Sequence, residues 1–241
     1  MNDVKTHYDK LLGPVYSWIL GDFEQAQARN AALFDRLDLH PVETGVAVDL
    51  GAGPGCQSVP LADRGYDVVA IDFCAELLDE LRVHARERTI RTVCDDICDF
   101  RKRVDRADLV VCMGDTLVHL PDRAKVEAVL LDMAAAVVPG GSVVISIRDY
   151  VSPGPTGKDR FIPIRSSRDR IFTCFLEYEE EVVNVHDILQ CRDGDSWTLD
   201  ISGYRKLRLD IEWAGSVLAS AGLDVRRRFD AAGMLGLMAR R

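Results

Sequence analysis

The stretch Val48-Asp49-Leu50-Gly51-Ala52-Gly53-Pro54-Gly55 decides the fold of this sequence. It joins an apolar run, which predicts a short buried strand, to a segment that is typical of a helix. Glycines at alternate positions let the backbone turn sharply and let a ligand approach within contact distance. In a dinucleotide-binding loop of the G-x-G-x-x-G type, the third glycine would stand where this chain has Cys56, which argues against a nicotinamide cofactor.

Strands and helices alternate on the C-terminal side of this turn and resume near the end of the chain. Such alternation is typical of a parallel sheet that is covered by helices on both faces, so we predict a doubly wound α/β fold. The expected strands are residues 46–50, 67–72, 90–94, 109–113, 142–147, 225–229 and 234–239. The expected helices are residues 57–64, 75–86, 122–138 and a segment that Asp210 caps.

Two segments depart from this alternation. Residues 1–40 predict an N-terminal helical cap, in which Asp22 caps a helix that runs to Leu37. Residues 150–209 contain short apolar runs separated by turn signals, which predict an antiparallel β insertion that forms a lid. Its expected strands are residues 161–165, 170–177, 181–189 and 197–202. The α/β domain itself is then expected to comprise residues 41–149 and 210–241.

Composition narrows the classes of function. Thirty basic side chains against thirty-nine acidic ones give the 241-residue chain a net charge of −9, so a phosphate surface would repel it and we expect neither a nucleic-acid nor a membrane partner. No apolar run reaches the ~18–20 residues that cross a bilayer, and we expect no secretory leader. Seven cysteines without zinc-site spacing predict reduced thiols, no bound metal and a cytoplasmic location.

Acidic residues mark the ends of the next predicted strands. Asp72 lies 21 residues after Gly51, where a carboxylate accepts hydrogen bonds from both hydroxyls of a ribose. Asp96 and Ile97 follow the third strand, where an acid and an aliphatic side chain suit the amine and the ring of an adenine. Open α/β sheets bind ligands at this carboxyl edge. The alternatives are that Asp72 only caps a helix and that Asp96 is a solvated acid, with Asp95 or Asp99 in its role.

Together these residues resemble the class I S-adenosylmethionine-dependent methyltransferases. The segment Asp49–Gly55 is similar to the first motif of that family, and Pro139-Gly140-Gly141 resembles the turn before its fifth strand. The resemblance covers residues 42–149 and 210–241 and implies a seven-stranded Rossmann-like sheet with an antiparallel last strand. It implies S-adenosyl-L-methionine as cofactor, bound by Asp49, Gly51, Gly53, Gly55, Asp72, Phe73, Asp96, Ile97, Met113 and Gly114.

A narrower resemblance suggests the acceptor side of the site. The segment Cys112–Leu120 is similar to the corresponding loop of glycine and amino-sugar N-methyltransferases, although several of those have asparagine or serine in place of Asp115. It implies Asp115, His119 and Tyr8 as catalytic residues, and Tyr16, Arg148 and Tyr204 as substrate-binding residues. Most of them also have a purely structural alternative. His119, Tyr8 and Tyr16 are also suited to a core, and Arg148 to a salt bridge with Asp149 or with the β insertion.

These features predict in-line methyl transfer to a nitrogen or oxygen of a small molecule, by a monomer or homodimer. Two alternatives remain open at this point. One is a non-catalytic module that binds S-adenosylmethionine or its demethylated product. The other is a nicotinamide-dependent oxidoreductase, which the alternate-glycine spacing and Cys56 disfavour.

Overall fold

A computed structural model describes residues 3–231 and 233–241. The chain divides into two compact units. The α/β unit comprises Asp22–Asp149 and Leu209–Arg241, and the insertion unit comprises the residues up to Gly21 together with Tyr150–Arg208. The segment that was expected to form one N-terminal cap, residues 1–40, is therefore divided between the two units.

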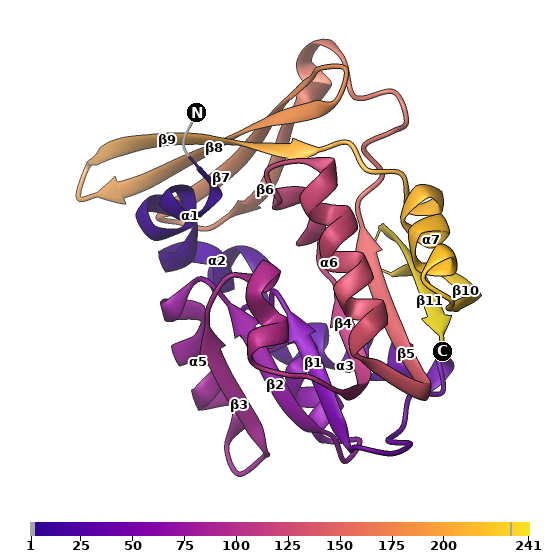
Figure 1. Ribbon diagram of the computed structural model, residues 1–241. Helices are drawn as coiled ribbons and strands as arrows, with labels where there is room; N and C mark the ends of the chain where they lie inside the picture. Colours follow the sequence, from indigo (N-terminus) through magenta and orange to yellow (C-terminus); the bar gives the residue numbers. More distant parts are fainter. Residues whose placement is uncertain (1–2, 232) are drawn as a thin grey trace. The chain divides into compact units, whose positions relative to one another are not determined.

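The α/β unit is built on a seven-stranded sheet in the order β10-β11-β5-β4-β1-β2-β3 (Figure 1). β10 and β11 are antiparallel to their neighbours, while β5, β4, β1, β2 and β3 are parallel. This order confirms the predicted doubly wound fold with an antiparallel last strand beside the fifth. The strands are β1 (Val46–Leu50), β2 (Asp67–Asp72), β3 (Ile90–Cys94), β4 (Ala107–Cys112), β5 (Val137–Ile147), β10 (Asp224–Ala231) and β11 (Met234–Arg240).

Helices lie on both faces of this sheet. In Figure 1, α6 and α7 lie side by side over one face, and α3 lies behind the other. The helices of this unit are α3 (Phe23–Arg36), α4 (Ser58–Ala62), α5 (Ala75–Ala85), α6 (Arg123–Ala136) and α7 (Ile211–Ser220), with the 3-10 helices η2 (Ile97–Lys102) and η3 (Leu117–His119). The helix predicted to run to residue 138 ends at Ala136, because Pro139 disfavours helical backbone in the residue before it and Val137 is already extended.

Helix α3 belongs to the α/β unit because its apolar face packs into the core of that unit. Leu33 and Phe34 are buried in the same cluster as strand residues such as Ala47 and Leu109. Asp22 caps the helix as predicted, since its carboxylate accepts the N–H of Gln25 at 3.0 Å. The helix is therefore part of the scaffold that supports the sheet.

The insertion unit contains a four-stranded antiparallel sheet in the order β6-β7-β8-β9. Its strands are β6 (Phe161–Ser166), β7 (Arg170–Tyr178), β8 (Val182–Asp193) and β9 (Ser196–Leu207), and they confirm the predicted β insertion. The N-terminal helical segments are α1 (Val4–His7), the π-helix η1 (Tyr8–Leu12) and α2 (Gly13–Leu20), while η4 (Gly157–Arg160) is a 3-10 helix. Leu11, Leu12 and Val15 pack against Phe172 and Leu189 in a core of its own.

Among the residues that the structure describes, no helix has both the length and the apolar character needed to cross a membrane.

Candidate functional site

The glycine loop follows β1, which pairs with β2 on one side and β4 on the other. Gly51, Gly53 and Gly55 all have positive φ, at 77°, 51° and 97°. A Cβ at Gly51 would overlap the side chain of Thr116, and one at Gly55 would overlap Leu81. A Cβ at Gly53 would meet no atom within 4 Å. Gly51 and Gly55 thus permit close packing, whereas Gly53 borders open space that a ligand can enter.

Asp72 holds this loop in place from the end of β2. Its Oδ2 accepts the N–H of Gly53 at 2.9 Å, and its Oδ1 accepts the N–H of Cys74 at 2.8 Å. Helix α5 begins one residue after Cys74, so Asp72 is not its N-cap. Each carboxylate oxygen of Asp72 keeps a further lone pair, so both oxygens can also accept hydrogen bonds from hydroxyl groups.

Asp49 is the most unusual group of the loop. Its carboxyl is buried, with Oδ2 accepting a 2.6 Å hydrogen bond from the Ser58 hydroxyl. Its Oδ1 has no hydrogen-bond partner within residues 3–231 and 233–241. Burial raises the pKa of Asp49 to about 7, and the nearby charge of Asp72 adds to the rise while the Ser58 bond opposes it. A buried carboxylate oxygen without a donor suits a cationic ligand group.

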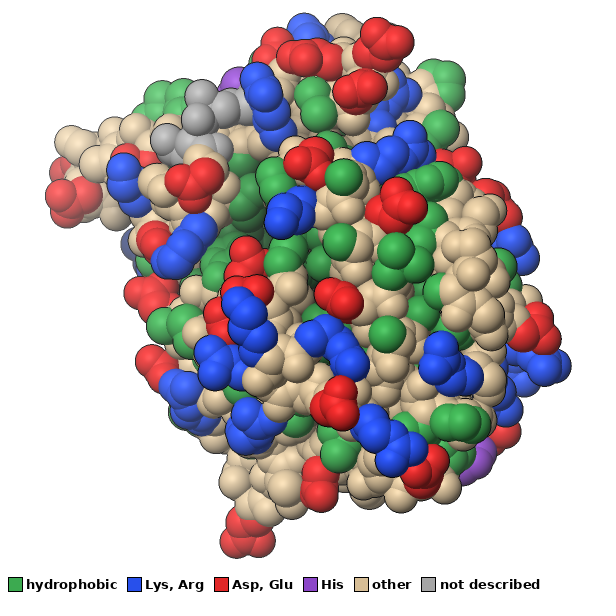
Figure 2. Space-filling model, viewed as in Figure 1, with side chains coloured by type: hydrophobic (Ala, Val, Ile, Leu, Met, Phe, Trp, Pro, Cys, Tyr) green, Lys and Arg blue, Asp and Glu red, His purple; other side chains and the backbone are tan. Residues whose placement is uncertain are grey.

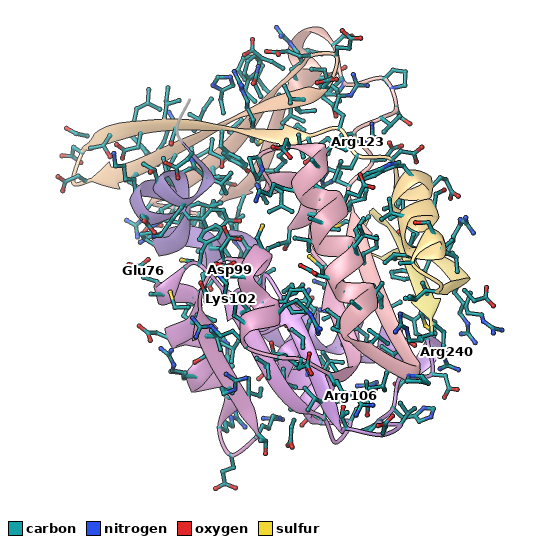
Figure 3. All side chains as sticks on the ribbon, viewed as in Figure 1. Glu76, Asp99, Lys102, Arg106, Arg123 and Arg240 are labelled. Carbon is teal, nitrogen blue, oxygen red and sulfur yellow. The ribbon has the colours of Figure 1, made fainter. Side chains whose placement is uncertain are left out.

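The end of β3 carries the predicted adenine-binding pair. Asp96 is exposed and caps η2, where its Oδ1 accepts the N–H of Cys98 at 2.8 Å. Ile97 is buried, and Phe73, after β2, is half-buried. The two alternative acids form ion pairs. Asp95 lies 2.6 Å from Arg103, and Asp99 lies 2.8 Å from Lys102. Figure 3 labels the second pair, Asp99 and Lys102.

A second tight turn follows β4 and carries the predicted acceptor side. Gly114 and Asp115 both have positive φ, at 74° and 75°, which is uncommon for a non-glycine residue and is often found at functional sites. The Asp115 carboxyl is buried, and its Oδ1 accepts the N–H of Arg148 at 2.9 Å. Gly114 donates its N–H to the Ser146 hydroxyl at 3.1 Å. These two bonds fix the turn to the end of β5.

Three further predicted residues surround this turn in different ways. Met113 precedes it and is buried, and His119 ends η3 in a half-buried position. Arg148 is exposed, and its guanidinium has no ion-pair partner in the described part of the chain, Asp149 included. The structure thus brings Asp49, Asp72, Asp115 and Arg148 to the ends of neighbouring strands of one sheet.

The three predicted tyrosines belong to the insertion unit. The rings of Tyr8 and Tyr16 lie 6.0 Å apart, and Tyr204 is buried with its ring 4.3 Å from that of His7. Burial raises the pKa of the Tyr204 phenol. All three pack within their own unit, and their part in a functional site stays a prediction.

Two contributors to the site were missed from the sequence. The hydroxyl of Ser58 donates to Asp49, and that of Thr116 donates to the carbonyl of Met113 at 3.0 Å while its side chain fills the space beside Gly51. A lone serine or threonine has no spacing that distinguishes it, so only the folded structure reveals these contacts.

Comparison with known proteins agrees with this geometry. Residues 47–141 match a family model described as a methyltransferase domain. A glycine/sarcosine N-methyltransferase of Halorhodospira halochloris is 30% identical over 106 residues, which is 43% of this chain and 40% of the relative. A ubiquinone biosynthesis O-methyltransferase of Aeromonas salmonicida is 36% identical over 102 residues, or 41% of each chain. This chain spans about two fifths of the length of these relatives.

Solved structures match over nearly the whole chain. An amino pentose methyltransferase from Micromonospora echinaspora, solved with bound S-adenosylmethionine, has a TM-score of 0.78 at 17% identity and covers 96% of this chain and 97% of its own. An S-adenosylmethionine-dependent methyltransferase from Clostridium acetobutylicum has a TM-score of 0.72 at 16% identity, covering 98% and 96%. At such low identity these likenesses show the fold, which is the predicted Rossmann-like one.

Proposed function

We propose that this chain, whose residues 47–141 match a methyltransferase-domain family model, is a class I methyltransferase that transfers a methyl group from S-adenosylmethionine to a small-molecule acceptor. The observations that carry the proposal are the buried Asp49 carboxyl, whose Oδ1 has no donor among the described residues, and the open space at Gly53 in the loop that follows the same strand. This combination fits the amino-acid end of the cofactor, because its ammonium supplies the missing donor and its chain needs close access to backbone.

The proposed roles of the other cofactor-binding residues follow from their positions at the ends of the strands. Asp72 accepts the ribose hydroxyls with the lone pairs that Gly53 and Cys74 leave open. Asp96 accepts the adenine amine, while Ile97 and Phe73 flank the ring, with Met113 and Gly114 closing the other side. When bound, the sulfonium supplies a methyl group that is already activated, so the protein needs only to align the acceptor and exclude water.

The acceptor is proposed to be a small molecule that is methylated on nitrogen or oxygen. The relatives include a glycine/sarcosine N-methyltransferase and an O-methyltransferase of ubiquinone biosynthesis, and one structural neighbour is an amino pentose methyltransferase. Arg148, whose guanidinium has no ion-pair partner in the described chain, is suited to an acceptor carboxylate. His119 is suited to accept the proton that an amine or hydroxyl loses, because an imidazole is a common general base at neutral pH.

Asp115 and the insertion unit complete this proposal. The Asp115 carboxylate accepts the N–H of Arg148 at the end of β5, and we propose that it anchors an ammonium or hydroxyl of the acceptor. Tyr8, Tyr16 and Tyr204, which belong to the insertion unit, are proposed to bind the acceptor. Acidic and basic side chains are interspersed on the face shown in Figure 2, which supports a small molecule rather than a nucleic acid as partner.

The test is titration calorimetry with S-adenosylmethionine, followed by an acceptor screen that measures the demethylated product. Gly53→Ala should weaken cofactor binding at least about tenfold, because its Cβ enters the open space and its φ of 51° strains an alanine. Gly65→Ala is the matched control. Its φ is 87° and its Cβ also meets nothing within 4 Å, but it follows α4 away from the loop, so binding should change less than about twofold.

The outcomes separate the competing functions. No binding of S-adenosylmethionine would contradict the proposal, and tight binding of NADH in its place would indicate an oxidoreductase. Binding that is abolished by Gly53→Ala, without methylation of any amine, hydroxyl or amino-sugar acceptor, would indicate a non-catalytic binding module.

A further inference from the structure

The two edge strands of the insertion sheet differ in how they are protected. β6 has six residues, contains Pro163, and carries a register shift between Pro163 and Arg165. Prolines, bulges and charges of this kind prevent an edge from pairing with another chain. β9 has twelve residues and pairs with β8 without interruption from Val182↔Leu207 to Asp193↔Ser196. Within the described residues, β8 is its only strand partner, so its outer edge is regular and is not paired with a further strand, while α1 contacts β9 through His7 and Ser202.

The side chains of β9 show the same openness. Trp197, Leu199 and Ile201 alternate along the strand and therefore point to one face of the sheet. They are 46%, 57% and 60% exposed. On the other face, Ser202 and Tyr204 are buried. Three large exposed apolar residues on a long free edge are a site at which another chain is expected to pair.

Charge is distributed unevenly along this edge. The hairpin that precedes β9 contains Asp193 and Asp195, and Arg192 lies 3.8 Å from the fully exposed Asp195, which leaves this end with a net charge of −1. The other end of β9 carries Arg205, which is exposed, and Lys206. A second β9 that runs antiparallel would place the acidic end of one strand beside the basic end of the other. A parallel neighbour would instead place like charges together.

We propose that two copies of this chain pair through β9, in antiparallel orientation, to form a continuous eight-stranded sheet about a two-fold axis. The axis lies at Ile201, so that Ile201 of each copy faces its equivalent. This register places Leu199 opposite Gly203, which adds no side chain of its own to the contact, while the His186 ring lies over Gly203 from the neighbouring strand β8. It also places Trp197 opposite Arg205, a pair suited to a cation–π contact.

A second copy fits this edge better than an unrelated strand. A two-fold interface uses the same patch on both partners, so each residue must suit its own symmetry mate. The edge meets this condition, because its apolar centre is self-complementary and its ends are oppositely charged. Centring the axis one residue earlier would place Asp200 against Asp200, which like-charge repulsion disfavours.

The first test is sedimentation velocity of the full-length protein over about 1 to 100 µM. The wild type should be dimeric, and Ile201→Lys should raise the dimer dissociation constant at least about tenfold, because two lysines would then meet at the axis. Ile164→Lys is the matched control. Ile164 is 45% exposed and lies on the protected edge strand β6, so this variant should remain a dimer. A monomeric wild type at 100 µM, or equal effects of the two variants, would overturn the proposal.

The second test measures the register and does not depend on the folding of a lysine variant. Ile201→Cys should form an intermolecular disulfide on air oxidation, because residues directly opposite in an antiparallel pair have Cβ atoms about 4.5–5.5 Å apart. Leu199→Cys is equally exposed but faces Gly203 in this register, and should cross-link no more than the wild type, whose seven cysteines set the background. Cross-linking of both variants to the same extent, or of neither, would overturn the register.

Discussion

At the scale of single residues, the Asp49 carboxyl determines how the site responds to pH. Burial raises its pKa to about 7, so the group is largely neutral below that pH and ionised above it. A cofactor ammonium stabilises the ionised form, so binding releases a proton at pH below 7. We expect the affinity for S-adenosylmethionine to rise up to about tenfold per pH unit between pH 5 and 7, and to level off above pH 7.5.

This pH dependence is measured by titration calorimetry in two buffers with different ionisation enthalpies. Asp49→Asn is the control, because it removes the titrating group and should give weak binding that varies little between pH 5 and 8. Without cofactor, the stability of the folded protein changes with pH in the opposite direction to the cofactor affinity. The folded pKa lies above the unfolded value of 3.8, so ionisation destabilises the free protein as pH rises from about 4 to 7. An affinity that falls with pH in the wild type would contradict this assignment.

The residue scale also shows what the sequence reveals about the site. The spacing of Asp72 from the glycine loop is a local signal, and the structure does place this carboxylate on the N–H of Gly53. The distinction among the three glycines is not local. It depends on Thr116 and Leu81, which approach Gly51 and Gly55 from other elements, and no pattern in the loop itself shows which glycine is left with open space.

At the scale of elements, Asp108 fastens the start of β1 to β4. Its carboxylate accepts the N–H groups of Val42, Glu43, Thr44 and Gly45 at 2.7–3.1 Å. Burial alone would raise the pKa of Asp108, but these four bonds outweigh it and lower the pKa to about 2. The ionised form therefore stabilises the fold above pH 4, and this contribution is lost as pH falls from about 4 to 2.

We predict that Asp108→Asn lowers the free energy of unfolding by about 2–4 kcal/mol at pH 7, since an amide offers one acceptor oxygen and turns a donor toward backbone donors. Urea unfolding followed by circular dichroism measures this change. Asp67→Asn is the control. Asp67 is exposed at the start of β2, so this substitution should lower the free energy of unfolding by less than about 0.5 kcal/mol. Equal losses in the two variants would mean that the Asp108 bonds add nothing to stability.

The sequence largely predicts which segments are helices and which are strands, whereas it does not predict where several of these elements end. Apolar runs bounded by turn residues located every strand of the seven-stranded sheet, because burial on both faces leaves a local signature. β9 extends to Leu207, beyond the predicted end at residue 202. Its continuation depends on pairing with β8 down to Val182, and such long-range pairing leaves no trace in the strand's own sequence.

At the scale of the whole molecule, the division into two units was only partly predictable. The β insertion stood out because it interrupts the alternation of strands and helices. The assignment of α3 to the α/β unit was not predictable, because the pattern of an amphipathic helix shows that one face is buried but not which core that face enters. Leu33 and Phe34 join the α/β core, whereas Leu11 and Val15, in the preceding helical segments, join the core of the insertion unit.

The buried His7 links the N-terminal helices to the insertion sheet. Its Nε2 lies 2.9 Å from Asp187 Oδ2 and its Nδ1 lies 2.8 Å from Ser202 Oγ. We predict that His7→Ala lowers the free energy of unfolding of the insertion unit by about 2–4 kcal/mol, because it leaves a buried carboxyl and hydroxyl without this partner. The proposed cofactor residues belong to the α/β unit, so cofactor affinity measured by calorimetry at 15 °C should change less than about twofold.

Turnover distinguishes this prediction from a general loss of structure. If Tyr8, the next residue along the chain, lines the acceptor side, His7→Ala should lower kcat at a temperature where the protein remains folded, while the affinity for S-adenosylmethionine is retained. His40→Ala is the matched control, because the His40 side chain is 58% exposed and should affect neither stability nor turnover. Parallel losses of cofactor affinity and stability in His7→Ala would show that the two units do not act separately, and would contradict the assignment of cofactor binding to the α/β unit alone.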